Sequence, residues 1–142
     1  MSAYSLYTTA EDMAYFLQAV LSEQPEQSSS AYLSNTGIEQ MFTPQVQVGD
    51  WPNLSWGLGW GIQQTEVGDL FWHWGAAAGF RNYIAGSREH RVGIIMFTNY
   101  EDGLPACSQI LSVLDNPYIG VSHPAFDWLL PFEDWREDGQ IV

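Results

Sequence analysis

The sequence predicts an α+β fold, in which an antiparallel four-stranded sheet is flanked by helices. Three features indicate this class: apolar residues recur with a helical period near the N-terminus, the period changes to two from Leu54, and a helical period returns near Leu104. At 142 residues we expect a single domain over 1–142. Its parts are a helical segment (1–50), the sheet (54–99), a closing helix (103–115) and an acidic aromatic tail (116–142).

Two helices are expected before the sheet. A threonine of the Thr8-Thr9 pair caps the first, and acids in its first turn favour the helix dipole. This helix should end near Ser22, and its apolar stripe is Met13, Phe16, Leu17, Val20 and Leu21. The second spans Leu33 to Phe42, with Ser34 or Asn35 as its cap, and it ends at Thr43-Pro44.

Four strands should follow. In the first, from Leu54 to Ile62, large apolar residues alternate with glycines, so that one face has no side chains. The second carries His73, the third covers Phe80 to Ala85, and the fourth covers Val92 to Thr98. The fourth is apolar on both faces, which predicts that other layers cover both.

The closing helix has Pro105 near its start, and its apolar positions are Leu104, Cys107, Leu111 and Leu114. Cys107 is the only cysteine, so an internal disulfide is excluded, and we expect a buried, inert thiol. Beyond the helix, the segment from His123 to Leu130 could form a short docking turn. The acids of the tail are interpreted as a solvated surface.

The formal net charge of −13 argues against nucleic acids and anionic membrane surfaces as partners, because both repel an acidic protein. No apolar run is long enough to span a bilayer, and the first residues do not have the pattern of a signal peptide. The sequence does not indicate the cellular compartment of the protein.

The strand from Leu70 ends in a His73-Trp74-Gly75 triplet, a turn at Gly79-Phe80 follows, and Val92 to Asn99 comes next. With the segments 5–16, 40–45, 56–60 and 123–130, this ordered set resembles the C-terminal portion of the serine β-lactamase and penicillin-binding-protein-like hydrolases, a superfamily that includes class C β-lactamases, D-aminopeptidases and esterases. The resemblance covers most of the chain and implies a partial β-lactamase/transpeptidase-like fold.

In that family an H-x-G or K-T-G strand forms one wall of the active site. The resemblance implies that His73 positions developing charge, that Gly75 permits close backbone approach, and that the Ala76 N–H is an oxyanion donor. Trp74 stands where a small hydroxyl residue is common, which favours esters or peptides over a β-lactam carboxylate. Arg81 could meet a substrate carboxylate, or it could be a surface or strand-edge arginine.

The chain departs from the family by containing no lysine, so it has no S-x-x-K motif, and it has no Y-x-N motif. We expect both upstream of Met1 in a longer parent, and we expect this chain to be inactive alone. Two alternatives remain open: a non-catalytic binding module, and a rewired nucleophile such as Ser5 or Ser55. In the family the last strand pairs with N-terminal strands, so its open edge predicts a dimer, an exchanged element or the missing half as a partner.

Other candidates are weaker. His73, His90 and His123 have no partners at ligand spacing, so neither a metal nor a cofactor is expected. His90 is interpreted as a solvated turn residue. Without the surrounding motif, His73 would be a packed strand histidine. The seven tryptophans favour sheet packing over a ligand groove.

Overall fold

The computed structural model describes residues 6–22, 33–119 and 126–130, and it has the expected α+β fold. One antiparallel sheet runs through the chain in the order β1-β2-β3-β4-β5-β6. The elements in chain order are α1 (Ala10–Leu21), α2 (Asn35–Phe42), β1 (Val46–Gln47), β2 (Leu54–Trp56), β3 (Gly61–Thr65), β4 (Gly68–Ala77), β5 (Phe80–Ser87), β6 (Val92–Thr98) and α3 (Gly103–Val113). That residues 1–142 form a single domain stays a prediction.

The expectation of four strands was wrong, because the sheet has six. The segment predicted as a single strand from Leu54 is divided into β2 and β3 by a glycine-rich turn. Gly59 there has φ of +81°, which a strand residue does not adopt, and the Gly57 N–H donates to the Trp60 carbonyl across 2.7 Å. The sixth strand is β1, a two-residue strand between the second helix and Leu54, and it pairs with β2.

Side-chain caps start the two N-terminal helices, as the sequence predicted. Thr9 Oγ1 accepts from the Asp12 N–H at 3.1 Å, and α1 ends at Leu21, just before Ser22. Ser34 Oγ accepts from the Gly37 N–H at 3.0 Å. Each contact satisfies one of the N–H groups that have no partner within the helix, and this fixes where the helix begins.

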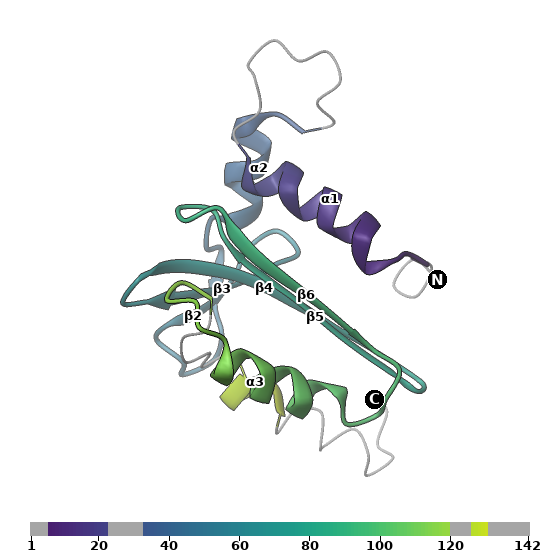
Figure 1. Cartoon of the computed structure of the whole chain (residues 1–142). Helices are drawn as coiled ribbons and strands as arrows, with labels where there is room; N and C mark the ends of the chain where they lie inside the picture. The colour runs from purple at the N-terminus through teal and green to yellow at the C-terminus, as the bar shows by residue number, and fades with distance from the viewer. Residues whose placement is uncertain (1–5, 23–32, 120–125, 131–142) are drawn as a thin grey trace.

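Helices cover both faces of the sheet. Figure 1 shows α1 and α2 on one side and α3 on the other. Residues on the α1 side form one apolar cluster: Leu17, Val20, Leu21, Trp60, Ile62 and Phe71. A larger cluster on the α3 side includes Trp72, Tyr83, Leu104, Cys107 and Leu111. Ile95 packs against the first cluster and Ile94 against the second, so the prediction that both faces of β6 are covered is confirmed.

Part of the tail docks on the α3 side. Residues 126–130 form a short helical turn, in which Phe126 and Leu129 are buried in the larger cluster and Trp128 packs against it. The expected docking turn is confirmed for these residues. His123 and the acidic residues after Leu130 lie outside the described part of the chain.

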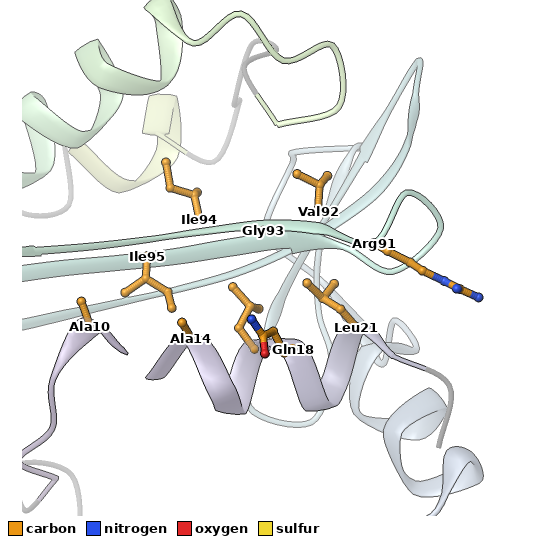
Figure 2. Close-up of a pocket in the computed structure, with 10 residues that line it drawn as sticks. Ala10, Ala14, Gln18, Leu21, Arg91, Val92, Gly93, Ile94 and Ile95 are labelled. Carbon is orange, nitrogen blue, oxygen red and sulfur yellow. The ribbon is translucent and has the colours of Figure 1, made fainter. Parts of the chain in front are cut away.

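β6 is the last strand of the sheet, and among the described residues it pairs only with β5. A groove of about 530 Å³ lies beside it, between α1 and β6. Figure 2 shows Ile95 directed towards α1 from one face of β6, with Val92 and Ile94 on the opposite face. None of the described helices is long and apolar enough to cross a membrane.

The contact between Gly61 and Trp72 gives a stability prediction. A methyl group on Gly61 would overlap the buried Trp72 ring, with its carbon 2.8 Å from Cδ2. We expect Gly61→Ala to lower the free energy of unfolding by about 1–3 kcal/mol, because the ring must move in a packed core. Urea unfolding measures the difference.

Gly75→Ala on the next strand is the matched control, since no heavy atom lies within 4 Å of the added carbon. It should unfold at nearly the wild-type urea concentration. Equal stability of Gly61→Ala and the wild type would contradict the packing described for Trp72.

Candidate active site

The His73-Trp74-Gly75 triplet lies where β4 loses one of its two neighbours. β3 pairs with β4 from Thr65↔Gly68 to Gly61↔Trp72. The glycine-rich turn precedes Gly61, so β3 begins there, and residues 73–77 pair only with β5 among the described strands. One backbone edge of this segment is therefore not paired with a strand, and we refer to it as the open edge of β4.

The Ala76 N–H points to the open edge. Ala76 is directly opposite Arg81, and the Arg81 carbonyl accepts a hydrogen bond from Thr98 Oγ1 of β6 at 2.6 Å. The Arg81 backbone groups thus point towards β6. In an antiparallel pair, two opposite residues point their backbone groups either towards each other or both away. The Ala76 N–H consequently faces away from β5, as an oxyanion donor on this edge must.

Aromatic rings surround the half-buried His73. Its ring centroid lies 5.9 Å from that of Trp56, 6.1 Å from Trp60 and 5.7 Å from Trp74. Burial lowers the pKa of the imidazole, and a backbone hydrogen bond with Trp74 opposes this effect. His73 is therefore neutral near pH 7, and it can act by hydrogen bonding rather than as a cation.

Gly75 and Trp74 differ in their surroundings. A methyl group on Gly75 would meet no heavy atom within 4 Å, so the face of the sheet is open at this residue. Trp74 lies edge-on to Trp56 at 6.3 Å and to Trp128 at 5.8 Å. Trp128 belongs to the docked turn, so the tail forms part of the surroundings of the site.

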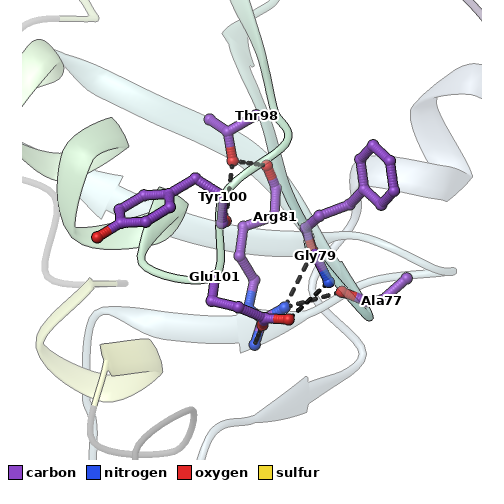
Figure 3. Close-up of polar contacts among 7 residues, drawn as sticks. Ala77, Gly79, Arg81, Thr98, Tyr100 and Glu101 are labelled. Carbon is purple, nitrogen blue, oxygen red and sulfur yellow. Dashed lines mark hydrogen bonds and ion pairs between the residues drawn. The ribbon is translucent and has the colours of Figure 1, made fainter.

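Arg81 lies at the turn between β4 and β5, as Figure 3 shows. Its Nη1 donates to the carbonyls of Ala77 at 2.9 Å and Phe80 at 3.0 Å, and its Nη2 lies 2.9 Å from Glu101 Oε2. Glu101 Oε1 also accepts from the Gly79 N–H at 2.6 Å. A role for Arg81 in binding a substrate carboxylate stays a prediction; in this structure its guanidinium already has a carboxylate partner.

The remaining candidates lie away from this edge. Cys107 is buried as expected, and burial raises the pKa of its thiol to about 11. His90 lies in the turn after β5 as expected, but it is half-buried rather than fully solvated: its Nε2 lies 2.6 Å from the Val67 carbonyl, and its ring stacks on Tyr118 at 3.8 Å. Within the described ranges, no group of three or more His, Cys, Asp or Glu residues is placed to hold a metal ion.

Sequence reasoning missed Glu101 and the contacts of Trp128. Glu101 is 22 residues from Gly79, and nothing in the sequence distinguishes it from the other acidic residues, of which the chain has 17 in all. Trp128 was within the predicted docking turn, but its contacts with Trp56 and Trp74 depend on how the tail folds back.

The antiparallel sheet between helical layers defines an α+β protein, and its His73-Trp74-Gly75 triplet lies on an open strand edge. A family model described as Beta-lactamase matches residues 1–113, and the chain belongs to this family.

The fold agrees with this assignment. The chain is similar to the octameric penicillin-binding protein homologue from Pyrococcus abyssi, with 21% identity and a TM-score of 0.55. The similarity covers 74% of this chain and 24% of that one, so the chain corresponds to about a quarter of the homologue. None of the curated proteins compared with the chain matches it.

The pKa of His73 gives a second prediction. Since burial lowers it, the ring should titrate below 6.5 in an NMR titration of the folded chain. The unfolded chain binds this proton more readily, so the free energy of unfolding should fall as the pH drops through about 6.5. His73→Asn should lack this component, as melting curves between pH 5 and 8 would show. Identical pH dependence in the two proteins would contradict it.

Proposed function

We propose that this chain supplies one wall of the acyl-transfer site of a serine hydrolase. The observation that carries the proposal is the open edge of β4, where His73, Gly75 and the Ala76 N–H occur together in a member of the β-lactamase family. Gly75 leaves room for an acyl group, and Ala76 is the candidate donor to the oxyanion that forms when its carbonyl is attacked.

In this proposal the chemistry follows the family pattern. A lysine-activated serine attacks an ester or amide carbonyl, the leaving group departs, and water hydrolyses the resulting acyl-enzyme. His73, as a neutral imidazole, orients the substrate by hydrogen bonding. Because the chain contains no lysine, the serine–lysine pair must come from other polypeptide sequence, and the 142 residues by themselves should be inactive.

The surroundings favour a small uncharged acyl, peptide or ester group as the substrate. Trp74 takes the middle position of the triplet, and its ring packs with those of Trp56 and Trp128. The guanidinium of Arg81 is paired with Glu101. These features favour an apolar acyl group over a carboxylate-bearing β-lactam.

A second candidate is a binding module derived from the same fold, and the absence of lysine is consistent with it as well. Such a module would hold an acyl or peptide group at the open edge without cleaving it. Genomic sequence upstream of Met1 separates the two: an in-frame S-x-x-K supports the hydrolase, and its absence supports the module.

The first test is hydrolysis by the purified chain. The panel contains a chromogenic cephalosporin, a short p-nitrophenyl ester and a D-amino-acid amide, with His73→Ala as the comparison. We expect no turnover above that of the variant, because the nucleophile is not in this chain. Turnover that disappears in His73→Ala would show that the chain has its own nucleophile, such as Ser55, and would refute the proposal.

We also propose that the free edge of β6 binds a second copy of the chain or the missing half. This strand has seven residues and no charged side chain, and Phe97 on it is 38% exposed. Such an edge pairs readily with another strand unless it is blocked.

Light scattering tests this association. We expect a dimer or larger assembly that Phe97→Lys shifts towards the monomer, because the lysine places a charge at the interface. Tyr15→Lys removes another exposed aromatic ring, from α1 rather than the sheet edge, and should leave the assembly unchanged. A monodisperse wild-type monomer would exclude association between copies.

A further inference from the structure

Backbone pairing along the open edge of β4 comes from β5 alone among the described strands. Residues 73–77 have no second strand beside them among the described residues, and the hairpin turns back immediately after Ala77. The position of the Ala76 N–H therefore depends on what fixes the β4–β5 turn. Among the described residues, the loop that connects β6 to α3 contacts this turn through Glu101.

Glu101 of this loop contacts both sides of the turn. One carboxylate oxygen accepts from the Gly79 N–H, and the other lies 2.9 Å from Arg81 Nη2. Gly79 has φ of +75°, so the turn holds a conformation that glycine tolerates and that the carboxylate then fixes. The Arg81 side chain is only 13% exposed, which shields its end of the ion pair from water.

Arg81 transmits this anchoring to the site, because it is the residue directly opposite Ala76. On its other side, the Arg81 carbonyl accepts from Thr98 Oγ1. Gly103, at the start of α3, packs so closely that a methyl group there would lie 2.8 Å from Arg81 Cβ. Arg81 is thus fixed by β6, by α3 and by Glu101, and its Nη1 donates to the carbonyl of Ala77, the residue next to Ala76.

We propose that Glu101 is a positioning residue, which sets the Ala76 N–H in place through Arg81 and the β4–β5 turn. This role of Glu101 rests on the proposed function, in which Ala76 is the oxyanion donor. Arg81 then supports the site, and the carboxylate of Glu101 holds it in place.

Amide NMR of the whole chain tests this, with Glu101→Ala as the main variant. Hydrogen exchange of the Gly79 amide should become about 10- to 100-fold faster, the range expected for loss of a hydrogen bond to a charged acceptor. The Ala76 amide resonance should move, while the amides of α1 and β3 keep their wild-type shifts and exchange rates. Glu66→Ala is the control, since Glu66 is an exposed glutamate in the turn between β3 and β4.

Two conservative variants separate the parts of the contact. Glu101→Gln keeps an oxygen for the Gly79 N–H but loses the charge facing Arg81, so it should restore Gly79 protection and leave a smaller Ala76 change. Arg81→Lys keeps the charge but loses the forked contacts with Ala77 and Phe80, and it should move Ala76 in the same direction. These two variants test the proposal if Glu101→Ala does not fold.

Two results would overturn the proposal. An unchanged Ala76 resonance in Glu101→Gln and Arg81→Lys would mean that the contact holds the turn alone. Faster exchange throughout the sheet would mean that Glu101 contributes only to global stability. Neither readout requires acyl transfer, so the amide results would remain valid if the proposed function were refuted. If the amide results instead refuted the role of Glu101, the proposed roles of His73 and Gly75 would not be affected.

Discussion

The packing of Trp72 against Gly61 is the constraint on which the rest of the structure depends. Trp72 is fully buried, and its ring occupies the space where Gly61 has no side chain. This contact lies at the last residue pair between β3 and β4. At Phe71 and Trp72, β4 is paired on both sides, with β3 and with β5; after Trp72 it is paired only with β5 among the described strands. The open edge is therefore a consequence of where β3 starts, and β3 starts where the glycine-rich turn allows it.

A strand that loses one neighbour needs support from elsewhere. Here it comes from three directions: β5 supplies the backbone pairing, the β6–α3 loop holds the turn through Glu101, and the docked tail contributes Trp128 beside Trp74. The burial of His73 belongs to the same arrangement, because its ring is surrounded by Trp56, Trp60 and Trp74. The candidate site is thus built from strand positions far apart in sequence, with its polar atoms on the backbone rather than on a cluster of charged side chains.

Local patterns predicted much of this fold. The caps at Thr9 and Ser34, the two-sided apolar strand at β6 and the buried Cys107 follow from residue type and spacing alone. The break between β2 and β3 was missed because alternating tryptophans and glycines have the period of a strand, while a positive φ at Gly59 is not visible in the sequence. Glu101 could not be predicted either, since its partners Gly79 and Arg81 become neighbours only when the sheet is formed. The ordered set of segments around the His73 triplet indicated the family, but the direction of the Ala76 N–H required the register between β4 and β5.

The open edge of β4 is the central claim, and amide hydrogen exchange of the wild-type chain tests it most directly. Ala76 and Trp72 are four residues apart on β4, and each is directly opposite a residue of β5. Because their spacing is even, their N–H groups point to the same side of the strand. Trp72 also has Gly61 beside it, so its amide should exchange slowly, at a rate set by unfolding of the sheet. The Ala76 amide should exchange orders of magnitude faster, as expected for an N–H without a strand partner. Equal, strong protection of both would mean that the edge is covered, and the proposed acyl site would then have no exposed donor.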